Sequence, residues 1–333
     1  MKTSPYLQLH CSSALAGYME DYVTQKRALG NVCRAEAQVL NQFDDYCIQQ
    51  GLSEAVLSQD LFDAWCEKRP HENGSTQRTR VEQLRMFAKF LVSNGIPAPT
   101  VFFPLPRASR TFVPYIFTHD EIIRLLAVAN ETEPAIHRGA PSLIHLALPV
   151  LLMMLYCCGL RIGESLKLKT EDVDLGSGVL RLLETKGGRE RLVPMSASLT
   201  RVCSEYRETP IVREYGSEYF FPAPDKSHYA VCTIYDRFRQ CLFMAGIPHG
   251  GRGKGPRLHD LRHTFAVHML NMWAVQGRDL YVALPILSVY LGHTSLKSTE
   301  QYLRLVPEAY AQITLAFEAG FGDVFPEVAD EHA

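Results

Sequence analysis

The stretch RLHDLRHTFAVHML, Arg257–Leu270, places three histidines, an aspartate and two arginines in a segment that otherwise has the apolar spacing of a buried helix. On a helix, His259 and Arg262 lie three residues apart and share a face. A helix N-terminus that faces water accounts for polar residues of this kind, since the charge of Asp260 is favourable there. The segment predicts a helix with one apolar and one charged face, and it leaves the role of the charge open.

Length and composition bound the class of protein. The chain has 333 residues and 47% apolar residues, enough for two domains that each have a packed core. Its nine cysteines form no C-x-x-C pair, and the N-terminus has no signal-peptide pattern. These features predict reduced thiols in a cytoplasmic protein. The longest apolar run, Leu146–Cys158, is shorter than the roughly 20 residues that span a bilayer, so we expect a buried helix and no membrane partner.

The formal charge is unevenly distributed along the chain. It is -2 overall, but residues 305–333 contain no Lys or Arg and six acidic residues: Glu308, Glu318, Asp323, Glu327, Asp330 and Glu331. Without these six acids the formal charge becomes +4. The main body of the chain is therefore compatible with a polyanionic partner, although the charge alone does not require one.

A proline-rich stretch divides the sequence. Five prolines occur between Pro97 and Pro114, which is typical of an extended linker. Before it, apolar residues recur at helical spacing, the last segment with Ser75 as its N-cap. The predicted helices span residues 12–28, 34–50, 53–68 and 75–94. We therefore expect a helical domain at 1–100, a linker at 101–114 and a second domain at 115–333.

The second domain mixes helices with one small sheet. Thr118 is a predicted N-cap, a long helix is expected near 142–157, and a short one begins near Arg161. The runs GVLRLLE and RERLVPM have strand character and flank TKGG, where Gly187 and Gly188 supply a tight hairpin turn. The predicted fold class is thus mainly α with a small antiparallel β-sheet in the C-terminal domain (α+β).

Four further polar residues stand at marked positions. Arg161 follows a glycine turn, Lys186 sits at the hairpin tip, and Tyr302 follows His293 by nine residues. Taken singly, each has an ordinary explanation: a surface ion pair of Arg161 with Glu164, a solvated turn lysine, a core tyrosine. Taken in order, the pattern R…K…HxxR…LGH…Y has a small probability of arising by chance.

With these residues in place, the second domain resembles the tyrosine recombinase, or phage integrase, family over roughly residues 115–310. The strings GLRIGE, HDLRHTFAVH and YLGH carry the resemblance most specifically. The N-terminal helices, with STQRTRVEQLRMFAKFLVSNG, are similar in arrangement to that family's core-binding domain. Thirty residues separate Arg262 from His293. This spacing is longer than the compact spacing of the members that resolve chromosome dimers, and it resembles that of integrases carried by transposable elements. The resemblance implies a site-specific DNA recombinase whose catalytic residues are Arg161, Lys186, His259, Arg262, His293 and Tyr302.

The chemistry fits these residue types. A phosphodiester passes through a state with negative charge on its equatorial oxygens, which the planar guanidinium groups of Arg161 and Arg262 match. By analogy with single oxyanion-hole donors, we expect each to contribute ~3 kcal/mol or more of transition-state stabilisation. The resemblance implies that the Tyr302 phenol is the nucleophile, and because its ordinary pKa is about 10 it needs a base. The covalent link preserves the phosphodiester energy, so resealing needs no ATP.

Proton transfers are assigned to the remaining residues. His259 is the natural acceptor of the phenol proton and His293 a natural donor to the phosphate. The resemblance assigns protonation of the 5′-oxygen leaving group to Lys186. Glu164 and Asp260 are expected to orient the arginines or the histidine. No metal and no cofactor are expected, because the arginines supply the positive charge.

The expected partner is double-stranded DNA, bound in a salt-sensitive way through phosphate contacts. The candidate contacts are Arg78, Arg80, Lys89, Arg237, Arg239, Arg252, Lys254 and Arg257. For each of them a solvated surface charge is an equally good explanation. After Tyr302, PEAYAQITLAFEAGF has the spacing of an amphipathic helix. In the family such a tail docks on a neighbouring protomer, which implies a homotetramer, or an assembly with related recombinases, on paired sites in the nucleoid.

Three other functions remain open at this point. HDLRH mimics the H-E-x-x-H of zinc hydrolases, although Asp260 is shorter than Glu and Arg262 lies between the two histidines. A type IB topoisomerase shares the tyrosine chemistry but relaxes supercoils without exchanging partners. An inactive DNA-binding accessory protein is disfavoured by the complete catalytic set.

Overall fold

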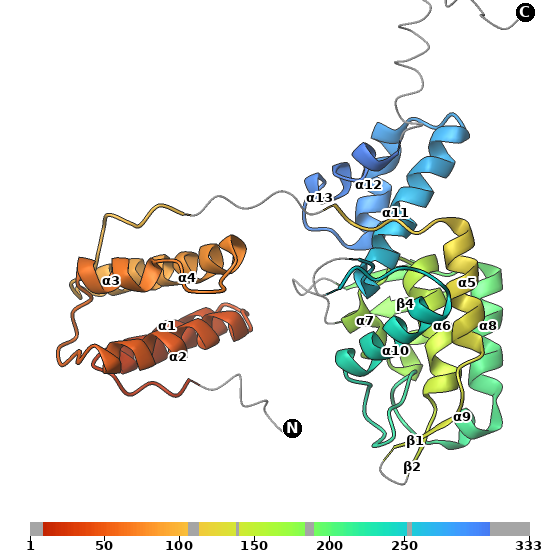
Figure 1. Ribbon diagram of the computed structural model, residues 1–333, viewed down its shortest axis with the longest axis horizontal. Coiled ribbons are helices and arrows are strands. Elements are labelled where there is room, and N and C mark those ends of the chain that lie inside the picture. The colour runs from red at the N-terminus through yellow and green to blue at the C-terminus, as the bar shows by residue number, and fades with distance from the viewer. Residues whose placement is uncertain (1–8, 106–112, 138–139, 184–189, 252–254, 307–333) are drawn as a thin grey trace, which may run out of the picture. The chain divides into compact units, whose positions relative to one another are not determined.

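The computed structural model describes residues 9–105, 113–137, 140–183, 190–251 and 255–306 (Figure 1). The chain divides into two compact units, Met1–Phe112 and Val113–Ala333. Each unit has its own hydrophobic core. The predicted tail helix after Tyr302 lies outside the described residues.

The first unit is helical, as the apolar spacing predicted. Its helices are α1 (Ala16–Ala28), α2 (Arg34–Gln49), α3 (Gln59–Cys66) and α4 (Gly74–Ser93). The prediction that Ser75 caps the last helix was wrong. Asn73 is the N-cap, because its side-chain oxygen accepts the backbone N–H of Thr76 at 2.8 Å. The core is aromatic, with Phe43 packed edge-on against Trp65 at 5.2 Å between ring centroids.

The second unit is mainly helical with a small antiparallel sheet, which confirms the predicted fold class. Its helices are α5 (His119–Asn130), α6 (Ile144–Cys157), α7 (Ile162–Leu166), α8 (Ala197–Glu208), α9 (Pro210–Glu214), α10 (Val231–Met244), α11 (Leu258–Val275), α12 (Leu280–Leu291) and α13 (Lys297–Glu300). Strands β3 (Val173–Asp174), β4 (Val179–Leu182) and β5 (Arg191–Pro194) form the sheet in that order. A second pair, β1 (Ala135–His137) and β2 (Ala140–Ser142), was not expected. The predicted Thr118 cap is present as a capping box with Glu121.

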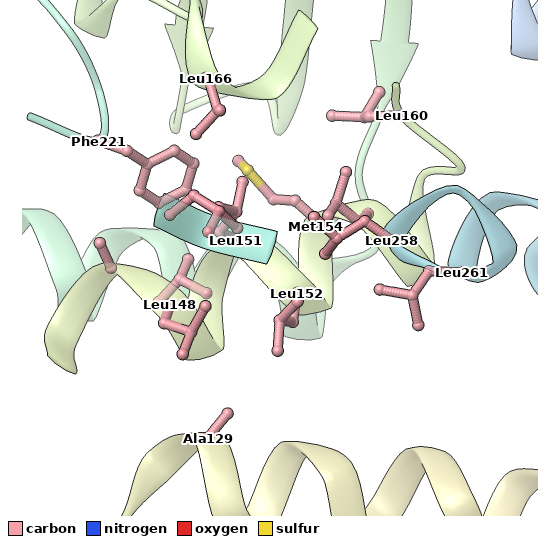
Figure 2. Packing of buried hydrophobic residues seen from close by; sticks show 14 of the residues in the cluster. Ala129, Leu148, Leu151, Leu152, Met154, Leu160, Leu166, Phe221, Leu258 and Leu261 are labelled. Carbon is pink, nitrogen blue, oxygen red and sulfur yellow. The ribbon is translucent and has the colours of Figure 1, made fainter. Parts of the chain in front are cut away.

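Helix α6 forms the centre of the second unit. It is the apolar run that the sequence assigned to a buried helix, and its side chains meet residues of α5 and α11 (Figure 2). Leu258 and Leu261 of α11 pack against this centre and are almost fully buried. Fully burying one such leucine stabilises the fold by about 1.5–3 kcal/mol, so the position of α11 is firmly fixed. In the part of the chain that is described, no helix combines the length and apolarity needed to cross a membrane.

A glycine turn joins α6 to α7. Gly159 has φ +58°, in the left-handed region, and a Cβ there would lie 2.6 Å from Cδ1 of Phe265 on α11. Only glycine allows both the turn and this close approach. The turn places Arg161, just before α7, near Arg262 of α11.

Candidate active site

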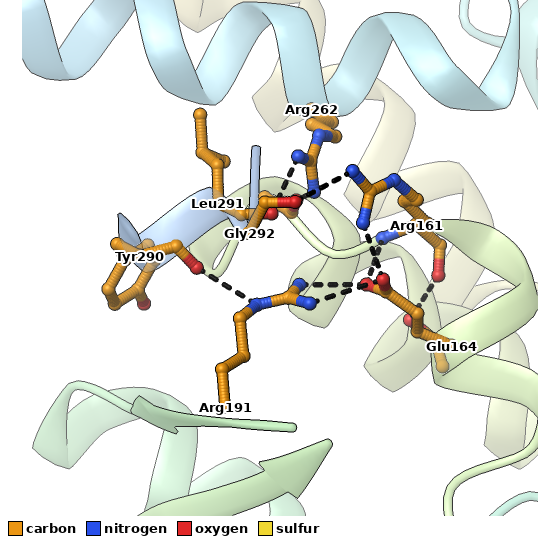
Figure 3. Close-up of polar contacts among 9 residues, drawn as sticks. Arg161, Glu164, Arg191, Arg262, Tyr290, Leu291 and Gly292 are labelled. Carbon is orange, nitrogen blue, oxygen red and sulfur yellow. Dashed lines mark hydrogen bonds and ion pairs between the residues drawn. The ribbon is translucent and has the colours of Figure 1, made fainter. Parts of the chain in front are cut away.

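Arg161 is the N-cap of α7, and its guanidinium points toward the end of α12 (Figure 3). It donates to Oε1 of Glu164 at 2.7 Å and to the carbonyl oxygen of Gly292 at 3.1 Å. The ion pair with Glu164 considered from the sequence is therefore present. It is not a surface pair, because the Glu164 side chain is 6% exposed while that of Arg161 is 24% exposed.

A second arginine, Arg191 on β5, holds the other side of Glu164. It donates to Oε1 at 3.2 Å and to Oε2 at 2.8 Å, and its Nε donates to the carbonyl oxygen of Tyr290. Burial alone would raise the pKa of Glu164, but its contacts with Arg191, followed by those with Arg161, lower that pKa to about 2. Sequence reasoning missed Arg191, since an arginine beside a hairpin usually faces water.

Arg262 lies inside the second unit, with 1% of the residue exposed. Its two terminal nitrogens donate to the carbonyl oxygens of Gly159 and Leu291, each at 2.7 Å. Burial, followed by the charge of Arg161, lowers the Arg262 pKa to about 10, so the group stays cationic at neutral pH. The Asp260 carboxylate accepts from Arg257, with Oδ2 2.8 Å from the backbone nitrogen, so among the described contacts it pairs with Arg257 and not with Arg262.

Tyr302 stands just before the 3-10 turn Leu303–Leu305 and is 1% exposed. Its hydroxyl lies 2.8 Å from Nδ1 of His263, one helical turn beyond His259. Burial raises the Tyr302 pKa, while the nearby charges of Arg262 and Arg161 act in the opposite direction. The structure thus brings the predicted nucleophile and both predicted arginines together.

His263 is a site residue that sequence reasoning missed. We had expected His259 to accept the phenol proton, yet in the described structure the histidine in hydrogen-bond contact with the phenol is His263. The two imidazoles meet edge to face with centroids 4.7 Å apart. From the sequence, His263 was considered only as a possible zinc ligand. Its position one helical turn after His259 indicates that the two side chains share a face of the helix.

The histidines of the site are uncharged at neutral pH. Burial, followed by the charges of Arg257 and Arg262, lowers the pKa of His263 to about 4. His259 is exposed, but the partial desolvation of its ring by the surrounding protein, followed by the charges of His263 and Arg262, lowers its pKa to about 4 as well. For His293, burial, followed by the charge of Arg262, lowers the pKa to about 3. Each neutral imidazole has one unprotonated ring nitrogen, which can accept a hydrogen bond or a proton.

His293 is held by a hydrogen bond with Thr299. Its Nδ1 lies 2.7 Å from Oγ1 of Thr299, which is fully buried. Its ring is stacked beside that of Tyr302, with centroids 6.2 Å apart. Nδ1 is therefore occupied, and among the described contacts Nε2 is the ring nitrogen that stays available.

Lys186 and its turn glycines, Gly187 and Gly188, lie outside the described residues. The strands on either side are described, and β4 pairs with β5 in the antiparallel register expected of a hairpin. Because β5 begins with Arg191, this sheet is joined directly to Glu164 and, through it, to Arg161.

The candidate DNA contacts differ in their surroundings. Arg80 is 3% exposed and is bound to Glu72 at 2.8 Å and to the carbonyl oxygens of Trp65 and Glu67. Its assignment to DNA was wrong, because its donors stabilise the inside of the first unit. Lys89 and Arg239 are exposed, whereas Arg78, Arg237 and Arg257 are partly buried. Arg252 and Lys254 fall in a segment that the structure does not describe.

The hypothesis that HDLRH binds zinc is not supported by the side chains around it. Within residues 9–306, gaps aside, no three His, Cys, Asp or Glu side chains gather where one metal ion would bind. Nδ1 of His263 faces Tyr302, and Asp260 is bound to Arg257.

Comparisons with known proteins show which family the chain resembles. The model of the phage integrase family matches residues 116–308. The integrase/recombinase y4rB of Sinorhizobium fredii is 30% identical over 313 residues, covering 92% of this chain and 97% of its own. Tyrosine recombinase XerD of Shewanella oneidensis is 28% identical over 301 residues, covering 88% and 92%.

Two solved structures share the fold. The Tn1549 transposon integrase, in complex with transposon right-end DNA, has a TM-score of 0.61 at 16% identity and covers 86% of this chain and 94% of its own. A lambda integrase dimer bound to a core site has a TM-score of 0.59 at 16% identity, with the same coverage. The chain therefore belongs to the phage integrase family, the tyrosine recombinases, whose members cleave and rejoin DNA strands.

Proposed function

We propose that this chain is a site-specific recombinase that cuts DNA with Tyr302 and joins the ends to a second duplex. The phenolic oxygen attacks phosphorus, a 3′-phosphotyrosyl link forms, and the bond to the 5′-oxygen breaks. The observation that carries the proposal is the meeting of Tyr302, His263 and Arg262 around one phenol, with Arg161 close by. These residues come from segments far apart in the chain, and a core tyrosine would need one hydrogen-bond partner but no two arginine charges beside it.

The arginines act as the electrophilic part of the site. Arg161 keeps part of its guanidinium exposed, and Arg262 lies beside the phenol. Two planar cations can bind the two non-bridging oxygens of one phosphate and stabilise the charge that develops on them. No metal ion is required for this role.

The phenol proton goes to His263 in our proposal. A neutral imidazole with an unprotonated Nδ1 accepts the hydrogen bond of the Tyr302 hydroxyl and then its proton as the oxygen attacks. His259 adjoins His263 edge to face and also faces outward, so it can assist this transfer or contact the phosphate. His293 contacts the phosphate through Nε2, and Lys186 protonates the leaving 5′-oxygen. The proton count thus balances over one cleavage step.

The first unit acts as the core-binding domain in this proposal, with Arg78 and Lys89 of α4 at the DNA backbone. In the second unit Arg237, Arg239 and Arg257, together with Arg252 and Lys254, are the proposed contacts. Recombination of two duplexes requires several active sites, so we propose a homotetramer, or a mixed assembly with related recombinases, on paired sites in the nucleoid. The transposon integrase among the structural neighbours favours a mobile element as the source of the DNA sites.

The test uses a duplex that the full-length protein selects from a random-sequence pool. The duplex is nicked beside the cleavage position so that the cut strand cannot be resealed. We expect the wild type to give a DNA adduct that survives denaturation, and Tyr302→Phe to give none while it still binds. An adduct in the variant would place the nucleophile elsewhere. Relaxation of plasmids without joining of two selected duplexes would favour the topoisomerase function instead.

A further inference from the structure

Three arginines meet at the end of one helix. The last carbonyl groups of α12 and its C-cap point into the site, and each accepts from a different guanidinium (Figure 3). The pairs are Tyr290 with Arg191 at 3.1 Å, Leu291 with Arg262 at 2.7 Å, and Gly292 with Arg161 at 3.1 Å. Carbonyls at a helix C-terminus have no partner within the helix and carry partial negative charge, so they are natural acceptors for cations.

The three guanidinium groups differ in access to a substrate. The side chain of Arg161 is 24% exposed and that of Arg191 is 9% exposed, while residue Arg262 is 1% exposed. Arg191 donates through Nε to Tyr290 and through both terminal nitrogens to Glu164. Its hydrogen bonds are thus directed at protein acceptors, and one of these acceptors, Glu164, is also the ion-pair partner of Arg161.

Glu164 has a single negative charge and two arginine partners. Oε1 accepts from Arg161 at 2.7 Å and from Arg191 at 3.2 Å, so one oxygen is shared between them. If Glu164 had only Arg161, that ion pair would be neutral, and a phosphate would compete with a carboxylate for the same cation. With Arg191 in place the three groups together keep one net positive charge.

We propose that Arg191 is a positioning residue, which neutralises Glu164 so that Arg161 remains available as a cation for the scissile phosphate. The inference rests on the proposed function, since it takes Arg161 as a phosphate ligand. Arg191 also joins β5, which follows Lys186 in the sequence, to the end of α12 that precedes His293. Close packing supports this link, because a Cβ at Gly292 would lie 2.8 Å from the Nη1 atom of Arg191.

The experiment compares single-turnover adduct formation on the nicked selected duplex for four proteins: wild type, Arg191→Gln, Glu164→Gln and the double variant. We expect Arg191→Gln to react at least about tenfold more slowly, with DNA affinity within about threefold of the wild type, because one electrophilic donor is weakened rather than removed. The double variant should recover most of the lost rate, since the neutral amide that replaces the carboxylate no longer competes for Arg161. A purely structural arginine would make the double variant as slow as the single one, or slower.

Arg201→Gln is the matched control, because Arg201 pairs with Glu205 on an exposed face of α8. It should react at the wild-type rate. Thermal unfolding checks that each variant is folded. If Arg191→Gln is unfolded, Arg191→Lys replaces it: a lysine keeps the neutralising charge, so its rate should stay within about threefold of the wild type.

Several results would overturn the inference. They are an unchanged rate in folded Arg191→Gln, a folded double variant with no recovery, or at least a tenfold loss in folded Arg191→Lys. Failure of the proposed function looks different, because the wild type would then form no adduct or Tyr302→Phe would form one. A wild-type adduct that is indifferent to Arg191 would contradict only the positioning role.

Discussion

At the scale of single residues, the phenol of Tyr302, the imidazole of His263 and the guanidinium of Arg262 form the centre of the proposed site. Arg161, Arg262, His293 and Tyr302 were named from their order in the chain, and the structure brings them together. His263 was missed because its spacing from His259 is equally typical of a metal-binding pair. Contacts between segments far apart in the chain leave no local signature, which also explains why Arg191 was not named.

The low pKa of His263 makes a prediction about stability. Its pKa is about 4 in the folded protein and near 6.5 when exposed, so the unfolded chain binds a proton first as the pH falls. This contribution to stability is complete above pH 6.5 and is lost as the pH falls toward 4. We expect the second unit of His263→Asn to lose less stability between pH 7.5 and pH 5 than the wild type does, by about 2 kcal/mol.

Urea unfolding at the two pH values measures this difference. His10→Asn, in the first unit, is the control and should keep the wild-type dependence, because it leaves the histidines of the second unit unchanged. An equal acid sensitivity in His263→Asn and wild type would show that His263 is not held neutral by its surroundings.

At the scale of elements, predictions held where a local pattern decides the structure. The Thr118 capping box, the apolar α6 and the pairing of β4 with β5 follow from neighbours in sequence. The start of α4 was misplaced because Asn73, Ser75 and Thr76 are all suitable caps, and only the backbone geometry selects Asn73. The arrangement of α12 against three arginines depends on tertiary packing, which local propensity does not contain.

The turn between α6 and α7 gives a prediction at this scale. Gly159→Ala places a methyl group 2.6 Å from Phe265 on a backbone with positive φ, so both packing and conformation are strained. We expect the free energy of unfolding of the second unit to fall by about 1–3 kcal/mol or more, measured by urea denaturation. Gly163→Ala in α7 is the matched control, since its Cβ meets no atom within 4 Å and the helix should not be weakened. Equal stability of the two variants would contradict the close approach.

At the scale of the whole molecule, two separate cores and a mainly helical second unit with a small sheet were predictable from composition, prolines and periodicity. The net charge of -2 by itself argued against DNA, and only its uneven distribution kept that partner open. The tetramer and the docking of the tail stay predictions. Both depend on surfaces that meet a second chain, and apolar spacing does not distinguish such a surface from one folded back on its own domain.

Two basic residues of α4 should behave in opposite ways. Lys89 is exposed, so Lys89→Ala should weaken DNA binding and lower the slope of log Kd against log salt by about 1, with unchanged stability. Arg80 is buried against Glu72, so Arg80→Ala should leave an uncompensated carboxylate and cost about 3–5 kcal/mol of stability. Salt titrations of binding and urea unfolding measure the two effects. A Lys89→Ala variant with the wild-type salt slope would remove α4 from the DNA interface.

The proposed mechanism depends above all on a covalent bond between the Tyr302 oxygen and DNA. Mass spectrometry of a trypsin and nuclease digest of the adduct, formed by the wild-type chain on the nicked duplex, locates that bond. We expect the nucleotide remnant on the peptide of residues 298–304, STEQYLR, attached to its tyrosine. A remnant on any other peptide, or on a serine or threonine of this one, would show that another residue attacks the phosphate.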